Sequence, residues 1–336
     1  MALPYAPSAP VLEGLTGDEL VLMASVTPRQ TQATTRSIAQ LGGSVMGTTW
    51  YVDTVNGSDT NSGRSSAAAF ATMGRAFYLP SGLSNLGPND LILFVGVVRE
   101  QLVAPLTKDI DGVATAVTGV SIVGVSGGGV RDDGGSKWTY PASGAVAGQA
   151  LLRCRQQGWS VSNFLMTPEA TSGACVELHR AEDAVNPDAS HFIADSMRFV
   201  GIDVTTTYGI QDIGGCSNVQ VQNCEFYLCT TGYYCSSTAI AVPLRNKFYG
   251  NRFLQNTNDI IAPMSYGLFQ GNRFYSSAAT EKVEISGGGF NIVTGNIFPD
   301  AAADIDPAHG YDGNATDTWT GNLVPNQAAF VFGDPA

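Results

Sequence analysis

Several acidic residues in the chain could take part in acid–base chemistry at its surface. Hydrolysis of a glycosidic bond needs two carboxyl groups about 5 to 10 Å apart, one protonated and the other ionised. The acids expected on outward strand or loop positions are Glu177, Asp183, Asp195, Asp203, Asp212, Glu225, Asp259, Glu281 and Glu284. Their spacing singles out no pair, so no catalytic residue is assigned.

Metal-binding patterns are weak throughout the chain. The histidines are His179, His191 and His309. They lack the spacing of metal ligands and follow no nucleophile motif. The loop from Asp53 to Gly63 carries oxygen ligands at Asp59 and Asn61, yet it lacks the distal bidentate Glu of a calcium loop. We interpret these as solvated turn residues and predict no metal or cofactor, with Ca²⁺ as the alternative.

Aromatic residues offer a second kind of chemistry, the binding of a sugar ring or a subunit. A Gly-rich stretch from Gly127 to Gly135 predicts a loop that protrudes with Trp138 and Tyr140. Tyr233 and Tyr234 form the densest group of aromatics expected to face outward. Tyrosine combines a flat apolar face with a hydroxyl group, which suits both a glycan and a subunit interface. Both interpretations stay open for these four residues.

The cysteines give no clear redox or metal signature. They are Cys154, Cys175, Cys216, Cys224, Cys229 and Cys235. No C-x-x-C pair occurs among them. Free buried thiols are the preferred interpretation, and a disulfide or a zinc site is the alternative.

The elements that position these residues are indicated by a repeat in the second half of the chain. An Asn followed closely by an aromatic or aliphatic residue ends each short hydrophobic run. The copies are Asn163-Phe164, Met197-Arg-Phe199, Asn223-Cys-Glu-Phe226, Asn251-Arg-Phe253, Asn272-Arg-Phe274, Asn296-Ile-Phe298 and Asn322-Leu323. A recurrence every 20 to 30 residues or so, with strand-like content, is typical of a solenoid. We predict an all-β fold, a right-handed parallel β-helix, with an antiparallel β-sandwich as the alternative.

In a β-helix each turn of the chain lies on the previous one, so like side chains stack. Residues that alternate with polar neighbours at period two are expected to face inward. They are Val219, Val221, Phe226, Phe248, Phe253, Phe269, Phe274, Ile292 and Ile297. The repeated Asn residues are expected to stack on one another in the same way, and the Gly before several of them suits a turn with positive φ.

Composition limits the partners. The 336 residues include 39 Gly and only 14% charged residues, with a net charge of −12. Because basic residues cluster nowhere, the composition argues against nucleic acid and anionic membranes as partners, whereas neutral glycans or a protein surface fit. The first residues, with Pro4, Pro7 and Pro10, have neither the basic start nor the apolar run of a signal peptide.

The first half of the chain contains the expected entry to the solenoid. We predict a strand over residues 49–53, an amphipathic helix over 67–77 and buried strands over 90–96 and 120–125. Phe70, Met73 and Phe77 share one face of that helix. A helix here would cap the open end of the solenoid, which otherwise offers unpaired strand edges.

Two stretches resemble known families. Leu-Thr-Gly-x-Glu-Leu-Val from Leu15, followed by Thr-Thr-x-x-Ile-Ala-x-Leu to Leu41, resembles an N-terminal module of bacteriophage tail fibres, tailspikes and head spikes. The words Tyr-Val-Asp, Asn-Gly-Ser-Asp, Phe-Ala-Thr and Arg99-Glu100 resemble the opening of pectate-lyase-like β-helices. The first resemblance implies that the N-terminal segment docks the protein onto a virion. The residues that would carry this anchor are Leu15, Thr16, Gly17, Glu19, Leu20, Ile38 and Leu41.

The resemblance implies a homotrimeric phage spike on the tail or the capsid, which adheres to host-surface glycan or decorates the particle. Residues 1–48 would form the anchor, 49–130 the β-helix entry and 131–336 its rungs and C-terminal end. The protein would be made in the host cytoplasm and reside in the virion. A polysaccharide depolymerase is the alternative, although the catalytic words of β-helical polygalacturonases and pectate lyases are missing apart from Asp132-Asp133.

Overall fold

The chain divides into two units, Met1–Val45 and Met46–Ala336. The computed structural model describes residues 47–110, 112–125, 135–168, 173–179, 188–201, 207–235, 242–275, 283–285, 288–298, 311–312 and 315–323, which all belong to the second unit. The predicted virion-anchor residues lie outside this part of the chain. No helix of the described part has the length and apolar character to cross a membrane.

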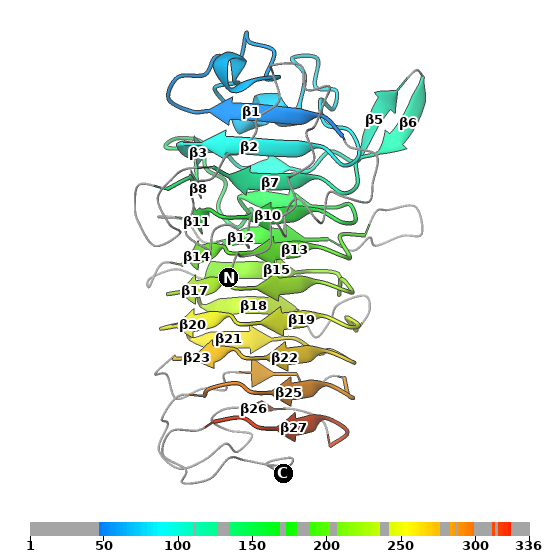
Figure 1. The fold of residues 1–336 in the computed structure, drawn as a ribbon, viewed down its shortest axis with the longest axis vertical. Helices are drawn as coiled ribbons and strands as arrows, with labels where there is room; N and C mark the ends of the chain where they lie inside the picture. Colours follow the sequence, from blue (N-terminus) through cyan, green and yellow to red (C-terminus); the bar gives the residue numbers. More distant parts are fainter. Residues whose placement is uncertain are drawn as a thin grey trace, which may run out of the picture. The chain divides into compact units, whose positions relative to one another are not determined.

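The described strands form three parallel sheets (Figure 1). The ten-stranded sheet contains β1 (Thr49–Asp53), β2 (Leu91–Val95), β7 (Ser121–Gly124), β10 (Ser160–Ser162), β13 (Ile193–Asp195), β16 (Gln220–Gln222), β19 (Lys247–Tyr249), β22 (Leu268–Gln270), β25 (Ile292–Thr294) and β27 (Thr318–Thr320). The seven-stranded sheet contains β3 (Val97–Arg99), β8 (Lys137–Thr139), β11 (Leu165–Thr167), β14 (Arg198–Val200), β17 (Glu225–Tyr227), β20 (Arg252–Leu254) and β23 (Arg273–Phe274). The eight-stranded sheet contains β4 (Leu102–Val103), β9 (Leu152–Cys154), β12 (Gly173–Leu178), β15 (Thr207–Asp212), β18 (Thr231–Cys235), β21 (Asn258–Ile261), β24 (Val283–Glu284) and β26 (Tyr311–Asp312).

From β2 to β24 each turn of the chain contributes one strand to each of the three sheets, and we call a turn a rung. For example, β16, β17 and β18 follow one another in sequence, and each pairs in parallel with its counterpart in the next rung, β19, β20 and β21. This arrangement is a parallel β-helix, as predicted, and the antiparallel sandwich is wrong. The one antiparallel pair among the described strands is the hairpin of β5 (Thr107–Ile110) and β6 (Val113–Ala116).

The capping helix is shorter than predicted. A 3-10 turn, η1 (Ser66–Ala68), is followed by the helix α2 (Met73–Phe77). Between them Asp59 accepts hydrogen bonds from the backbone N–H groups of Ala71 and Thr72, each at 2.9 Å, which hold this stretch out of a helix. Met73 and Phe77 are buried, and α2 contacts β1, the first strand of the ten-stranded sheet.

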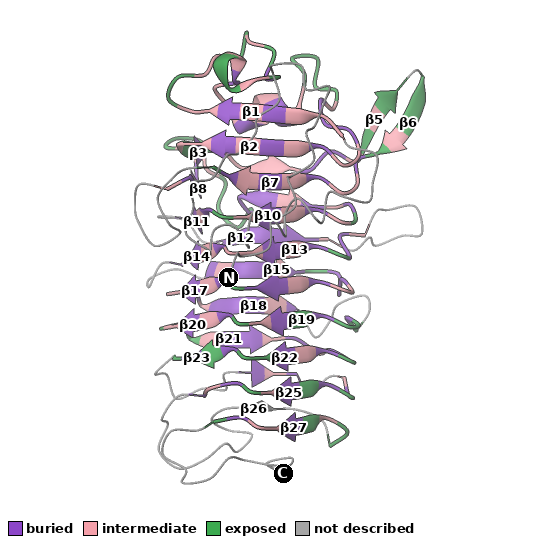
Figure 2. Ribbon diagram, in the orientation of Figure 1, coloured by how far each residue is buried: buried purple, intermediate pink, exposed green. Residues whose placement is uncertain are grey.

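The core contains a column of stacked aromatic rings among aliphatic side chains. The strands alternate between buried and more exposed residues (Figure 2). Phe226 and Phe253 stack at 4.8 Å and 5°, and Phe253 and Phe274 stack at 5.0 Å and 15°. Phe199 extends the column at one end and Phe298 at the other. This confirms the inward prediction for Phe226, Phe253 and Phe274.

A buried ladder of asparagines runs along the corner between the ten-stranded and seven-stranded sheets. The Nδ2 groups of Asn251, Asn272 and Asn296 each donate to the Oδ1 of the next asparagine, at 3.0, 2.9 and 2.9 Å, and Asn322 ends the ladder. All four side chains are fully buried. The predicted stacking of these four asparagines is confirmed.

Other copies of the repeat differ by one position. Asn163 and Asn223 have φ values of 62° and 55°, and strand register aligns Asn223 with Gly250. They occupy the left-handed corner position, which suits Asn or Gly, and are not inward. The inward prediction for Ile292 is likewise wrong, because Ile292 is 45% exposed and its neighbour Val293 is buried.

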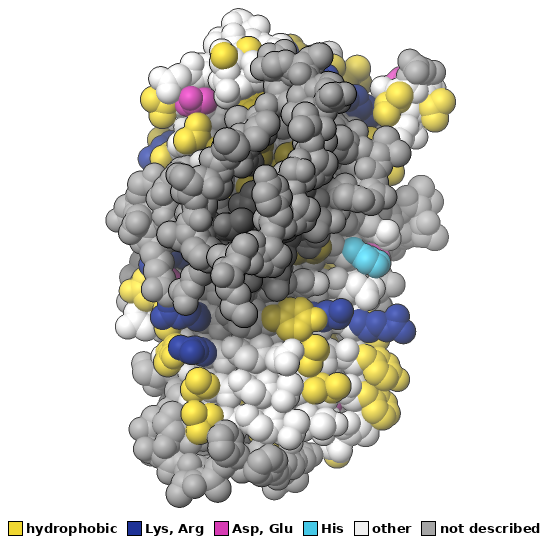
Figure 3. Space-filling view, in the orientation of Figure 1, with side chains coloured by type: hydrophobic (Ala, Val, Ile, Leu, Met, Phe, Trp, Pro, Cys, Tyr) yellow, Lys and Arg dark blue, Asp and Glu magenta, His cyan; other side chains and the backbone are white. Residues whose placement is uncertain are grey.

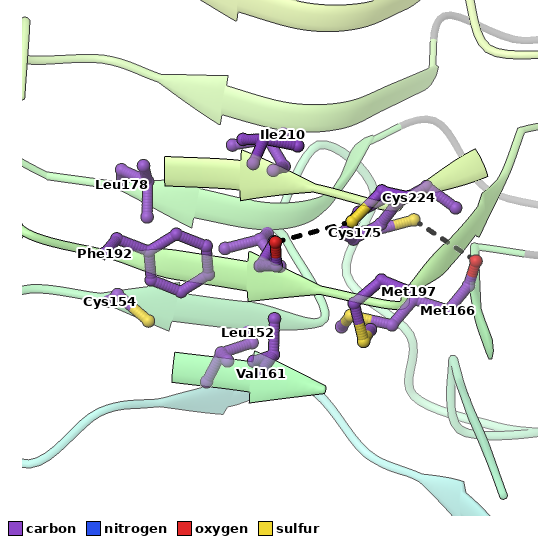
Figure 4. Close-up of a cluster of buried hydrophobic side chains, with 14 of the residues drawn as sticks. Leu152, Cys154, Val161, Met166, Cys175, Leu178, Phe192, Met197, Ile210 and Cys224 are labelled. Carbon is purple, nitrogen blue, oxygen red and sulfur yellow. Dashed lines mark hydrogen bonds between the residues drawn. The ribbon is translucent and has the colours of Figure 1, made fainter. Parts of the chain in front are cut away.

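All six cysteines are free and buried, as predicted. In Figure 4 Cys154, Cys175 and Cys224 lie among aliphatic side chains of the core. The thiols of Cys175 and Cys224 each donate to a backbone carbonyl 3.5 Å away. Burial raises the pKa of Cys229 to about 12, so that the thiol stays protonated and unreactive.

Candidate functional site

Charged side chains on the outer surface of the seven-stranded sheet form one column. Its members, Arg198, Glu225, Arg252 and Arg273, are the first residues of β14, β17, β20 and β23 and stand in register. We call them the arginine column. Arg198 Nε lies 2.9 Å from Glu225 Oε1, and Arg252 Nη1 lies 3.3 Å from Glu225 Oε2. A single carboxylate therefore bridges two guanidinium groups.

A pocket of about 130 Å³ opens at the corner beside this column and is lined by residues 196–198, 223–225, 250 and 252. Ser196, Asn223 and Gly250 have positive φ, which turns the chain sharply from one sheet to the next. The Nδ2 of Asn223 and the Oγ of Ser196 each donate to Asp195 Oδ1 at 3.1 Å. Because drug-sized ligands fill roughly 300 Å³ or more, this pocket suits one polar group of a larger ligand.

Two exposed aromatics stand at the opposite end of the ten-stranded sheet's strands, just before β22 and β25. Tyr266 and Phe290 are each 58% exposed, and their rings stack at 5.4 Å and 10°. Their φ values are 56° and 60°, a left-handed conformation that bulky residues rarely adopt. We call this pair the corner ridge. In Figure 3 exposed hydrophobic side chains gather along an edge of the lower rungs, with Lys and Arg side chains beside them.

The left-handed corner position recurs on earlier rungs with other residues. His191, Asn218 and Arg245 occupy it with φ between 57° and 63°. The backbone N–H of each one bonds to the carbonyl of the next rung. The fold thus requires the conformation at this corner but does not require an aromatic side chain there.

Glu177, predicted to face outward, is almost fully buried at 3% exposure. Arg153 Nε forms an ion pair with Glu177, and His179 Nε2 lies 2.7 Å from Glu177 Oε1. Burial opposes the ionisation of Glu177, but the hydrogen bond with His179 and the charge of Arg153 outweigh it and hold the pKa of Glu177 below its usual value. This carboxylate is therefore a buried, ionised partner of two partly exposed side chains.

Glu100 and Asp212 are two carboxyl groups whose pKa is raised. Burial raises the pKa of Glu100, whose oxygens accept the N–H groups of Met73 and Gly74. Burial raises the pKa of Asp212 to about 6, and Asp212 accepts hydrogen bonds from Cys216 N and the hydroxyl of Tyr233. Both groups hold backbone turns; Asp212 is fully buried, whereas Glu100 is partly exposed.

The predicted turn residue Asp59 is exposed to solvent, and its carboxylate also bonds to the protein. Asp59 accepts hydrogen bonds from Thr72 Oγ1 as well as from two backbone N–H groups. Asp53 accepts the N–H groups of Val55 and Asn56. Within the described ranges no three His, Cys, Asp or Glu side chains gather in a way that could hold a metal ion.

Three of the four predicted binding aromatics are not at the surface. Trp138 is fully buried in β8 and its Nε1 donates to the carbonyl of Glu100. Tyr140 is 4% exposed, and Tyr233 is fully buried. The placement of these side chains outside the core is therefore wrong. Tyr234 alone is partly exposed, and its ring lies 5.1 Å from that of Tyr208.

Of the other predicted acids, Asp195 and Glu225 lie beside the corner pocket, whereas Asp259 is fully buried. Asp183, Asp203 and Glu281 lie outside the described residues. The arginines of the column were not among the predicted site residues, although each immediately precedes a stacked Phe. The recurring Arg-Phe dipeptide is the sequence feature from which the arginine column could have been predicted.

No family model matches the chain, and no curated protein matches it in sequence. Among solved structures, it is similar to the GH136 lacto-N-biosidase from Eubacterium ramulus, with a TM-score of 0.56 and 10% identity over 88% of this chain and 58% of that chain. The fold is a right-handed parallel β-helix. The chain thus spans 58% of the length of that enzyme.

Two further similar structures have lower scores. The pectate lyase Pel9A has a TM-score of 0.44 and 11% identity over 84% of this chain and 80% of that chain. A tailspike protein double mutant of E. coli bacteriophage HK620, in complex with pentasaccharide, has a TM-score of 0.44 and 13% identity over 89% of this chain and 54% of that chain. At these identities the likeness extends to the fold alone.

Proposed function

We propose that this protein is the subunit of a homotrimeric phage spike, on tail or capsid, that holds host-surface glycan through the corner ridge without cleaving it. The proposal rests on one observation. Tyr266 and Phe290 expose more than half of their surface while keeping a backbone conformation that is costly for bulky residues.

The energetic argument is that the fold gains little from these rings. A non-glycine residue held in the left-handed region costs roughly 1 to 3 kcal/mol. A ring that is 58% exposed recovers only part of this by burial. Since earlier rungs accept Asn218 and Arg245 at the same corner, we infer that a ligand accounts for the aromatics.

The ligand's chemistry follows from the surroundings of the ridge. Flat apolar rings present their faces and edges to the C–H groups of sugar rings, and only 14% of the residues in the chain are charged. The fold shared with a lacto-N-biosidase supports a glycan as a ligand of this scaffold. The N-terminal resemblance supports the finer part of the proposal, in which residues 1–48 attach the spike to the virion.

Adhesion is favoured over hydrolysis by the state of the carboxyl groups. A glycosidase needs a carboxylic acid of raised pKa that faces an ionised partner across the substrate. Two carboxyl groups of raised pKa, Glu100 and Asp212, already accept hydrogen bonds from backbone N–H groups. This engagement argues against either of them acting as the catalytic acid.

We expect Tyr266→Gly and Phe290→Gly to separate binding from stability. Each should weaken binding to capsular polysaccharide or lipopolysaccharide about tenfold, because burying an aromatic face on a ligand contributes roughly 1.5 kcal/mol. Each should leave the unfolding free energy unchanged or raise it by about 1 kcal/mol, because Gly adopts positive φ freely. Biolayer interferometry against glycans of candidate hosts and thermal unfolding measure the two quantities.

Leu244→Ala is the matched control, since Leu244 is also an exposed apolar residue near this corner, at 42% exposure, and lacks the left-handed conformation. It should bind like the native protein. Unchanged glycan binding by both glycine variants would contradict the proposal, and a fall in oligomer mass would assign the ridge to a subunit contact instead.

A further inference from the structure

The arginine column contains a pair of like charges that the fold does not require. Arg252 and Arg273 are direct partners in the parallel pairing of β20 and β23. Neighbouring strands lie about 4.8 Å apart, and like charges placed opposite each other destabilise a sheet. At the same column position an earlier rung has Leu165, so an arginine is not needed to build the sheet.

The one carboxylate of the column is already engaged. Glu225 contacts Arg198 and Arg252, which leaves an excess of positive charge toward β23. Arg273 is exposed, and no acidic side chain in the described part of the chain forms an ion pair with it. The nearby Asp195 carboxylate accepts hydrogen bonds from Asn223 and Ser196 and belongs to the rung above Glu225.

This excess is conspicuous against the whole protein. The chain has 17 Lys and Arg against 29 Asp and Glu and a net charge of −12. A guanidinium group offers planar pairs of N–H donors that match the two oxygens of a carboxylate or a phosphate. Two such groups on adjacent rungs can hold an oxyanion between them, and Arg252 also lines the pocket of about 130 Å³, which can take a neighbouring polar group.

We propose that Arg252 and Arg273 bind an oxyanion carried by an acidic glycan, either a sugar carboxylate or a phosphate substituent. Glu225 limits the site on one side by neutralising Arg198 and one edge of Arg252. The anion site stands on the column geometry, and only the identity of its carrier rests on the proposed function.

The test uses the full chain and two matched probes, a glucuronate-containing oligosaccharide and the same oligosaccharide with its carboxyl groups reduced to alcohols. Arg273→Gln should weaken binding of the acidic probe about tenfold, the scale of a lost charge-assisted pair of hydrogen bonds, and leave binding of the reduced probe unchanged. Lys247→Gln is the control. It removes one exposed positive charge from the same rung as Arg252, but on the ten-stranded sheet.

Glu225→Gln distinguishes a binding role from a structural one. If the column binds anions, removing its carboxylate should strengthen binding of the acidic probe several-fold, because the Arg252 guanidinium loses its competing partner. If the column served only as a ladder of ion pairs, the substitution would lower the unfolding temperature without any gain in anion binding. That result would overturn the proposal.

Competition identifies the anion. Displacement of the acidic probe by sodium glucuronate at lower concentration than by inorganic phosphate assigns the site to a carboxylate, and the reverse order assigns it to a phosphate. Displacement by neither anion, or equal binding by Arg273→Gln and the native protein at low salt, would refute the inference. In that case an effect of Tyr266→Gly on glycan binding would still support the proposed function, so the two failures are distinguishable.

Discussion

Phe253→Ala is expected to lower the free energy of unfolding by about 5 kcal/mol. Truncating a buried Phe to Ala costs roughly 3 to 5 kcal/mol, and loss of each stacked aromatic pair adds roughly 0.5 to 1.5 kcal/mol. Phe253 stacks on Phe226 at 4.8 Å and on Phe274 at 5.0 Å, so the substitution interrupts the column in both directions. Denaturant-induced unfolding, followed by circular dichroism, measures the change.

The chain offers a matched control in Phe290, which is 58% exposed. The same chemical change, Phe290→Ala, should alter the unfolding free energy by less than about 1 kcal/mol. Because neighbouring rungs stabilise each other in a solenoid, Phe253→Ala should also broaden the transition as the two halves uncouple. Equal effects of the two substitutions would show that the ring column does not dominate the stability of the solenoid.

Asn272→Ala is expected to lower the free energy of unfolding by about 3 kcal/mol. The Asn272 side chain accepts the backbone N–H of Asn251 at 3.0 Å and donates to the carbonyl of Phe248 at 2.9 Å. Both backbone groups would be left buried without this partner, and each such group costs roughly 1 to 3 kcal/mol. Thermal and denaturant unfolding of the purified variant test this value.

Asn223→Ala serves as the control, since Asn223 lies on the exposed left-handed corner and forms one 3.1 Å side-chain hydrogen bond to Asp195. Its effect should be about 1 kcal/mol, mainly from the poorer fit of Ala to positive φ. A loss for Asn272→Ala that is no larger than this would mean that water satisfies the ladder and that the asparagines are not a specific stabilising feature.

The solenoid was predictable because its repeat places the same residue type at the same point of each rung. Phe226, Phe253 and Phe274 belong to a motif that repeats along the sequence. Their rings stack in the structure, as the repeat predicts. The asparagine ladder followed from the same logic at Asn251 and Asn272. In a solenoid the pairing of distant strands follows directly from the sequence repeat. A single sequence was therefore enough to predict the fold.

The incorrect predictions of inward-facing residues were each wrong by one position along the chain. Strands of three residues offer too short an alternation to fix which neighbour faces inward, so Ile292 was preferred over the buried Val293. Asn163 and Asn223 match the repeated word, yet they occupy the corner that Gly250 fills on a later rung. Asn satisfies both environments, since it tolerates positive φ and also pairs well inside a ladder.

The candidate site was harder to predict because surface positions come together through register between distant rungs. Trp138 was assigned to a protruding loop from the glycines that precede it, yet the pairing of β8 with β3 and β11 draws it into the core. Tyr266 and Phe290 were not among the predicted binding aromatics, although both are exposed. The contact between Tyr266 and Phe290 could be predicted only from the strand register, in which the backbone N–H of Tyr266 bonds to the carbonyl of Gly289 on the next rung.

We propose that the protein holds host-surface glycan and leaves it intact. The most direct test incubates the purified protein with capsular polysaccharide or lipopolysaccharide from candidate hosts and measures both the bound fraction and the chain-length distribution by size-exclusion chromatography. We predict bound glycan of unchanged length, with binding reduced in the double variant Tyr266→Gly, Phe290→Gly. Shortened chains would contradict this account and make the protein a depolymerase, and absence of binding to every host glycan would contradict adhesion itself.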